Sequence, residues 1–150
     1  MLGIRESRRI VCDYMLNVND YKARADFDDE IGRFSYPVDI HIMNTNPEEM
    51  KRFEEEYYSM HYKKGESYGI PLRSLIPADF SNAFVAGRCM GTDRQMEASI
   101  RVQPGCYITG QAAGTAAAMA VEKQDARSVD VRELQRELVK AGAYLRKELR

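Results

Sequence analysis

Hydrophobic and polar positions along the chain change between two spacings, one typical of strands and one typical of helices. Residues Tyr36–Ile42 alternate, with Val38, Ile40 and Ile42 on the face opposite Asp39 and His41, which predicts a strand over Val38–Ile42. Residues Tyr68–Ser74 also predict a strand, and the short apolar run Ala83–Ala86 before Gly87 predicts a buried one. Strands and helices together indicate an α/β protein.

Four stretches predict helices from apolar spacing and from residues that cap helix ends. Phe27 and Ile31, four residues apart, indicate a short helix over Phe27–Arg33 that follows possible caps at Asn19 or Asp20. Asn46 and Pro47 favour a helix start, and Gly65 after Lys63-Lys64 favours its end. Asp130 with Glu133 forms a capping box for the last helix, which Gly142 ends. The fourth helix covers Pro104–Val121.

The helix over Pro104–Val121 consists almost wholly of small residues. Gly110, Gly114 and Ala118 recur every four positions, so they form a stripe on one face that allows a backbone, a sheet or a flat ligand to come close. On this interpretation Gly114→Leu overpacks the helix against the sheet. The alternative is a tightly packed core helix with no ligand. A transmembrane helix is excluded because alanine, glycine, threonine and glutamine supply too little hydrophobicity.

The start of this helix is a candidate anion site. Pro104 suits a first helical turn, where the leading N–H groups lack partners and carry partial positive charge. No acidic residue lies between Arg101 and Val121 to neutralise that end. A strand, a glycine turn at Gly87 and a helix N-terminus together form an anion-binding arrangement. The polar connection Gly87–Arg101 adds arginines at positions 88, 94 and 101.

Composition excludes several classes of function. The chain has 150 residues, enough for one domain with a sizeable core, and a net charge of -1 that predicts no general attraction to nucleic acid or to an anionic membrane. Its three cysteines, Cys12, Cys89 and Cys106, show no spacing typical of disulfides or zinc, so we predict no metal site. The charged start lacks the apolar region of a secretory signal, and we predict a cytoplasmic protein.

Several motifs occur together in order. They are GIRESRRIVCDYML, YPVDIH, YGIPLRSLIP, LIPADFSNAFVAGRCMG, ASIRVQPGCYITGQAAGTAAAMAV and VDVRELQRELVKAGAYL. Together they resemble the C-terminal part of bacterial FAD-dependent oxidoreductases with the glutathione-reductase-like FAD fold. The resemblance covers nearly the whole chain apart from residues 44–66. It implies strands at Ile10–Met15, Val38–Ile42 and Tyr68–Ser74 that pair mainly antiparallel in a substrate-side sheet, and a parallel pairing for Ala83–Ala86.

The resemblance also implies a cofactor, FAD, and a small organic substrate. The implied cofactor-binding residues are Gly87, Arg88, Cys89, Arg101, Val102, Gln103, Pro104, Gly105 and Cys106. Substrate-side candidates are His41, Arg73 and Arg5, although a lone strand histidine is more often structural and Arg5 fits a solvated charged segment equally well. Family members often carry a histidine where this chain has Arg94, so no acid–base role is assigned to that loop. The catalytic residues are left unassigned.

The sequence contains no GxGxxG turn, the motif that holds the FAD pyrophosphate in this fold. We therefore predict a C-terminal piece of a flavoprotein, with substrate-side residues 1–77, including a helical excursion at 46–65, and FAD-domain residues 78–150. Alone it should bind FAD weakly or not at all, be inactive and self-associate through an open sheet edge and an apolar face. The alternative is a non-catalytic fragment that folds or oligomerises without FAD. In the full flavoprotein, the helix start should face the pyrimidine end of the flavin, so that Gly105→Asp lowers its reduction potential.

Overall fold

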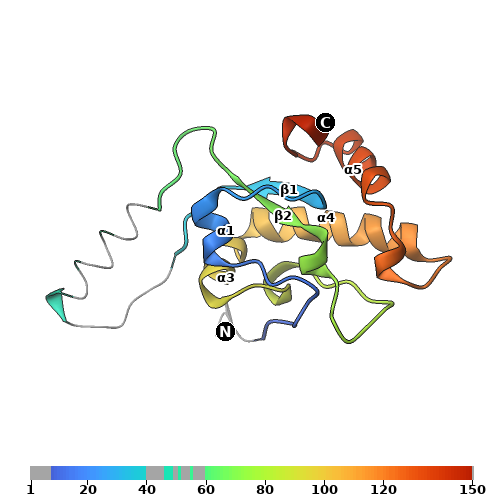
Figure 1. Ribbon diagram of the computed structural model, residues 1–150, viewed down its shortest axis with the longest axis horizontal. Coiled ribbons are helices and arrows are strands. Elements are labelled where there is room, and N and C mark those ends of the chain that lie inside the picture. Colours follow the sequence, from blue (N-terminus) through green and yellow to red (C-terminus); the bar gives the residue numbers. More distant parts are fainter. Residues whose placement is uncertain (1–7, 40–45, 49–50, 52–54, 56–59, 150) are drawn as a thin grey trace.

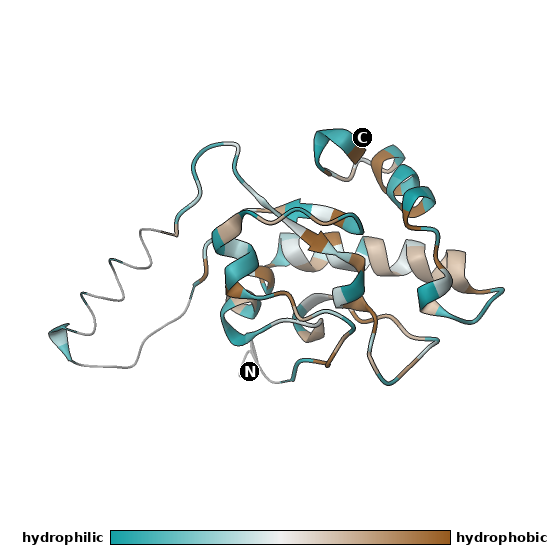
Figure 2. Cartoon of the chain, in the orientation of Figure 1, coloured by the Kyte–Doolittle hydropathy of each residue, from teal (hydrophilic) through white to brown (hydrophobic). Residues whose placement is uncertain are grey.

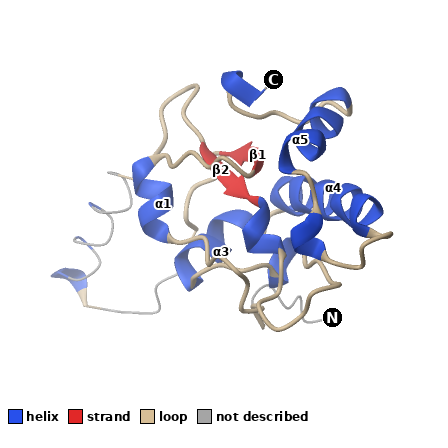
Figure 3. Cartoon of the chain, turned by 45° about the vertical axis from the view of Figure 1, so that its right-hand side comes forward, coloured by secondary structure: helices blue, strands red, loops and turns tan. Residues whose placement is uncertain are grey.

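The computed structural model describes residues 8–39, 46–48, 51, 55 and 60–149. Within these residues the chain forms a two-stranded sheet and four α-helices (Figures 1 and 3). The α-helices and strands follow in the order α1 (Val18–Ala23), β1 (Glu30–Phe34), β2 (Tyr68–Pro71), α3 (Arg94–Ile100), α4 (Gln103–Ala120) and α5 (Val131–Lys140). Short 3-10 helices are η1 (Leu72–Leu75), η2 (Gly87–Cys89), η3 (Ala126–Ser128) and η4 (Lys147–Leu149).

The sheet consists of β1 and β2, which pair antiparallel with Phe34 opposite Tyr68 and Gly32 opposite Ile70. The pairing shifts between Glu30 and Gly32, as at a β-bulge. The helix predicted over Phe27–Arg33 is therefore wrong, since most of it belongs to β1. The spacing of Phe27 and Ile31 fitted a helix, but the hydrogen-bonded partner strand, distant in sequence, decides the conformation.

The core lies between the sheet and α4, which crosses behind the strands in Figure 1 and contacts β1, α3 and α5. Buried Ile31 and Ile70 of the sheet belong to the same hydrophobic core as Ala112 and Ala116 on the buried face of α4. Figure 2 shows α4 as uniformly pale, whereas α5 has a brown side and a teal side. The amphipathic α5 therefore covers the core, while small side chains let α4 lie close to it.

Three of the predicted strands are not regular strands. The part at Ile10–Met15 bends at Asp13 and Tyr14 and makes a single bridge from Cys12 to Pro77. Ala83–Ala86 is an irregular segment in which the Val85 N–H donates to the Leu75 carbonyl, so no parallel sheet forms there. Val38 and Asp39 are also outside any strand, and residues 40–42 lie outside the described residues. Backbone groups of the first two segments bond to loops and 3-10 helices, as in the bonds from Ile10 to Cys89 and from Val85 to Leu75, so a short apolar run does not by itself form a strand.

Tyr68–Ser74 is a strand only as far as Pro71 and then turns into η1. The observed strand is shorter than the predicted one because Leu72 and Arg73 donate their N–H groups to Asp29. These bonds bend the backbone away from the sheet at the end of β2. The predicted polar connection from Gly87 to Arg101 instead contains η2 and α3. Helix α3 begins at the Asp93 cap, whose carboxylate accepts the N–H of Met96 at 2.7 Å.

Helix ends agree with the sequence at several points. Asp130 caps α5 by accepting the Glu133 N–H at 3.0 Å, as predicted. In α1 the cap is Asn17, with Asp20 as its capping-box partner, so Asn19 does not cap and Asp20 has the reciprocal role.

The helix predicted after Asn46 does start there, because the N–H of Glu48 donates to Asn46 Oδ1 at 3.0 Å. Lys51 and Glu55 are also helical, and most of the residues around them lie outside the described residues. The helix does not reach Lys63-Lys64, since residues 61–63 are not helical, and Gly65 lies in a turn with a φ of 91°.

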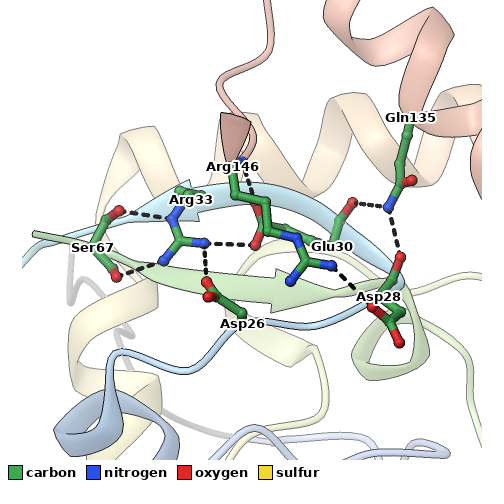
Figure 4. Close-up of polar contacts among 7 residues, drawn as sticks. All are labelled: Asp26, Asp28, Glu30, Arg33, Ser67, Gln135 and Arg146. Carbon is green, nitrogen blue, oxygen red and sulfur yellow. Dashed lines mark hydrogen bonds and ion pairs between the residues drawn. The ribbon is translucent and has the colours of Figure 1, made fainter. Parts of the chain in front are cut away.

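The C-terminal segment lies along the outer edge of β1 (Figure 4). The Arg33 N–H donates to the Tyr144 carbonyl at 3.0 Å, and the Arg146 N–H donates to Glu30 Oε1 at 2.8 Å. From α5, Gln135 Nε2 donates to the Glu30 carbonyl at 3.1 Å. Backbone and side-chain groups of β1 that face away from β2 are thereby paired within the chain, which protects the edge.

Candidate functional site

A glycine turn and the start of α4 lie side by side at the centre of the predicted site. The irregular segment Ala83–Ala86 precedes this turn. Its backbone is extended at Ala86 and turns at Gly87, which has a φ of 66°, a conformation that residues with a side chain disfavour. The Gly87 N–H donates to Thr109 Oγ1 at 2.9 Å. This bond joins η2 to the second turn of α4.

Helices α3 and α4 meet at a sharp corner. Arg101 ends α3 and Val102, in an extended conformation, starts α4, whose first residue is Gln103. Gly105 lies against this corner, since a Cβ atom placed on it would come within 2.3 Å of the Ile100 carbonyl oxygen. The corner is therefore possible only with glycine at this position, and it directs the positive end of α4 outward beside Arg101.

An open depression of about 440 Å³ lies at this corner. It is lined by Tyr36, Asp39, Arg88, Arg101, Val102, Gln103 and Pro104. Two of these residues carry guanidinium groups and one, Asp39, carries a carboxylate. The first turn of α4 adds N–H groups that have no acceptor within the helix. The depression can thus stabilise negative charge on a ligand.

Side chains of α3 hold the far wall of the depression in place. Ser99 Oγ donates to the Tyr36 carbonyl at 2.6 Å, and Arg101 donates to the Asp39 carbonyl at 3.0 Å. Buried Tyr68 shares a 2.9 Å hydrogen bond with Ser99, and burial raises the pKa of Tyr68, which keeps this hydroxyl neutral. The segment Tyr36–Asp39 is therefore positioned by two bonds from one helix.

The Arg101 guanidinium is nearly buried, with 13% of the side chain exposed, and lies 3.8 Å from a carboxylate oxygen of buried Glu97. Arg88 is exposed, and its Nε donates to the Arg101 carbonyl at 3.2 Å. The Cys106 thiol approaches the same carbonyl oxygen, with a separation of 3.6 Å. The arginines thus lie in fixed positions with respect to the helix start.

The thiols of Cys106 and Cys12 are not activated nucleophiles. Burial raises the pKa of Cys106, although nearby Arg88 acts in the opposite direction. Burial also raises the pKa of Cys12 to about 11. Both thiols are therefore protonated at neutral pH. Across the part of the chain that the structure describes, no cluster of three or more His, Cys, Asp or Glu residues is suited to hold a metal ion.

The predicted cofactor-binding residues come together in space. Arg88, Arg101, Val102, Gln103 and Pro104 line the depression, and Gly87, Cys89, Gly105 and Cys106 belong to the turn and helix start that form it. Their role towards a cofactor stays a prediction. Arg94 is the first residue of α3.

The substrate-side candidates are not brought to this depression. Arg73 forms a 2.9 Å ion pair with Asp29 and borders a separate cavity of about 280 Å³ together with Asp13 and Arg127. His41 and Arg5 lie outside the described residues.

Sequence reasoning missed the residues that support the site, above all Thr109, Ser99 and Tyr36. A signal was present for Thr109, which is a polar residue four positions after Gly105 and shares the buried face of α4 with Ala112 and Ala116. No comparable signal existed for Ser99, because its partners are more than 30 positions away.

The stripe of small residues does not face the sheet. Gly110, Gly114 and Ala118 are exposed, and a Cβ atom added to either glycine would meet no atom within 4 Å. The predicted overpacking of Gly114→Leu against the sheet is therefore wrong. The buried face of α4 instead carries Gly105, Thr109, Ala112, Ala116 and Ala120.

Comparison with known proteins gives a family but no individual relative. No curated protein and no solved structure matches the chain. None of the helices in the described residues is long and apolar enough to cross a membrane. The family model described as FAD dependent oxidoreductase matches residues 1–138, which is most of the chain and includes the glycine turn, the depression and α4. The chain belongs to the FAD-dependent oxidoreductase family, whose cofactor is FAD.

Proposed function

We propose that this protein contributes to FAD-dependent oxidation or reduction of a small organic substrate, and that the depression at the start of α4 faces the isoalloxazine ring. The observation that carries this proposal is the joint position of Arg88, Arg101 and the first turn of α4 around one open depression. Reduced flavin carries negative charge at its N1–C2=O end, and these groups match that charge.

The flavin supplies the hydride or electron transfer when it is bound. The chain supplies position and electrostatics. N–H groups at Gln103 and Gly105, together with the Arg101 guanidinium, stabilise negative charge beside the helix start. The glycine at position 87 lets the backbone approach the ribityl chain or the pyrophosphate, and Arg88 adds positive charge there.

We further propose that the chain is the C-terminal part of a bacterial, cytoplasmic flavoprotein with the glutathione-reductase-like FAD fold. Support comes from the motifs of residues 82–121 and from the absence of a GxGxxG turn in the sequence. On this proposal the chain provides the flavin-facing half of the site and is inactive alone. Arg73 is a weak substrate-binding candidate because Asp29 neutralises it away from the depression.

Titration of the chain with riboflavin, followed by amide NMR, tests this function. We expect weak binding, with a Kd on the order of 1 mM, and shifts confined to residues 36–39, 86–89 and 101–106. FAD should bind at most about tenfold more tightly than riboflavin, because its pyrophosphate meets the Gly87 turn and Arg88 but no GxGxxG turn. Lumichrome, which lacks the ribityl chain, serves as a control for ring binding alone.

Two outcomes contradict the proposal. Shifts only at residues away from the depression, or none at the highest riboflavin concentration that dissolves, favour the alternative of a non-catalytic fragment that folds without flavin. FAD binding that is 100-fold tighter than riboflavin binding shows that the chain holds a complete cofactor site, and this result refutes the assignment as a partial one.

A further inference from the structure

We propose that Thr109 is the positioning residue of this site, because its hydroxyl holds the Gly87 turn, and with it Arg88, against the first two turns of α4. The inference rests on the proposed function only in calling the depression flavin-facing. The positioning itself depends on contacts within the chain and is tested separately.

The Thr109 hydroxyl connects two parts of the site that are 22 residues apart in sequence. Its Oγ1 accepts the Gly87 N–H at 2.9 Å and lies 2.9 Å from the Gly105 carbonyl oxygen, to which it donates. The side chain is fully buried. A hydroxyl can accept and donate at once, so one atom satisfies the N–H of the turn while it is oriented by the helix.

No hydrophobic side chain of the same shape can replace this contact. Valine fills the volume of threonine but accepts no hydrogen bond, so the Gly87 N–H would face an apolar surface. Serine keeps the hydroxyl and loses only a methyl group. A second hydrogen bond joins η2 to the corner between α3 and α4. It runs from Arg88 Nε to the Arg101 carbonyl at 3.2 Å and is exposed to solvent. The Thr109 contact is partly buried and is therefore the less exposed of the two.

The same helix provides a matched control. Thr115 Oγ1 donates to the Gln111 carbonyl at 3.0 Å, the same bond to the carbonyl four residues earlier that Thr109 makes to Gly105. It is only partly buried and lies a turn and a half further along α4. Thr115→Val therefore removes the same intrahelical bond without touching the glycine turn.

Amide hydrogen exchange measured by NMR on the full chain decides the positioning role. In Thr109→Val we expect exchange at Gly87 to rise roughly tenfold or more, the fold-change that corresponds to loss of one hydrogen bond. Thr109→Ser and Thr115→Val should leave Gly87 exchange within about twofold of the wild type. Unchanged Gly87 exchange in Thr109→Val, with the fold intact, overturns the inference, as does equal loss in Thr109→Ser and Thr109→Val.

Riboflavin titration of the same variants tests whether the position of the Gly87 turn affects ligand binding at the depression. We expect the shifts at residues 86–89 to disappear in Thr109→Val and to be kept in Thr109→Ser and Thr115→Val. If wild-type chain shows no riboflavin shifts at the depression, the proposed function fails, and Gly87 exchange still decides whether Thr109 positions the turn. If riboflavin shifts persist in Thr109→Val although Gly87 exchanges faster, the turn is not needed for the ligand and the inference is overturned.

Discussion

Gly105 and Gly114 lie nine positions apart on one helix, but a methyl group added to each would meet different surroundings. At Gly105 it would lie 2.3 Å from the Ile100 carbonyl oxygen, a backbone atom that cannot move aside alone. At Gly114 it would meet nothing within 4 Å. The predicted use of Gly105→Asp as a probe of flavin potential is therefore unsuitable, because any side chain at this position disturbs the corner itself.

Alanine at these two positions should change stability in opposite directions. We expect Gly105→Ala to lower the free energy of unfolding by about 1–3 kcal/mol through the clash with Ile100. Gly114→Ala should raise it by about 0.5–1 kcal/mol, because alanine loses less backbone entropy than glycine in a helix. Urea denaturation of both variants measures these two changes in the free energy of unfolding. Equal destabilisation by both substitutions would contradict the exposure of Gly114.

At the scale of elements, Glu30 connects strand β1 to the C-terminal segment. Its carboxylate is fully buried, accepts the Arg146 N–H at 2.8 Å and pairs with the Arg33 guanidinium at 2.8 Å. Burial raises the pKa of Glu30, Asp26 acts in the same direction, and the Arg146 N–H and Arg33 act against it. The folded state therefore binds a proton at Glu30 more tightly than the unfolded chain does.

This raised pKa predicts a pH dependence of stability. The contribution of protonated Glu30 is complete below the ordinary glutamate pKa and is lost as pH rises through the raised pKa of the folded state. Glu30→Gln cannot ionise, so the unfolding free energy of the wild type should fall relative to that of this variant across that window and stay parallel above it. Groups with a lowered pKa, Glu66 and Asp130, are present in both proteins and cancel.

Denaturation at a series of pH values measures the difference between the two proteins. Glu137→Gln is the control, because Glu137 forms only an exposed pair with Lys140. A difference that is flat with pH for Glu30→Gln, or one of the same size for Glu137→Gln, would show that Glu30 titrates as an ordinary surface carboxylate.

At the scale of the whole molecule, the free surface of interest is the exposed side of α4. Tyr107 and Val121 are each 68% exposed at its two ends, with Gly110, Gly114 and Ala118 between them. The helix carries no charged residue. By contrast, the C-terminal segment covers the β1 edge. Self-association is therefore expected through α4 and no longer through an edge at Ala83–Ala86, which forms no strand.

A charge placed on this face should prevent that association. We expect the wild-type chain to exceed its monomer mass of 17.2 kDa in light scattering after gel filtration at high concentration. Ala118→Glu should return it towards that mass, since association would bury an unpaired carboxylate. Ala141→Glu adds the same charge at an exposed site beyond α5 and should have no effect. A wild-type chain that stays monomeric at all concentrations would refute the expectation.

The sequence by itself determined the features that depend on neighbouring residues. The cap of α5 by Asp130 and the start of α4 near Pro104 follow from short-range chemistry. The family assignment likewise depends on motifs that are contiguous in the chain. These features need no knowledge of which distant segments meet.

Only the tertiary structure decided the features that depend on distant partners. Glu30–Phe34 is a strand because Tyr68–Pro71 pairs with it, although its own apolar spacing favours a helix. Which face of α4 is buried could not be predicted, since alanine, glycine and threonine differ too little in hydrophobicity to mark one side. Thr109 and Ser99 gain their roles from hydrogen bonds across 22 and 63 positions, so the local pattern does not identify their partners.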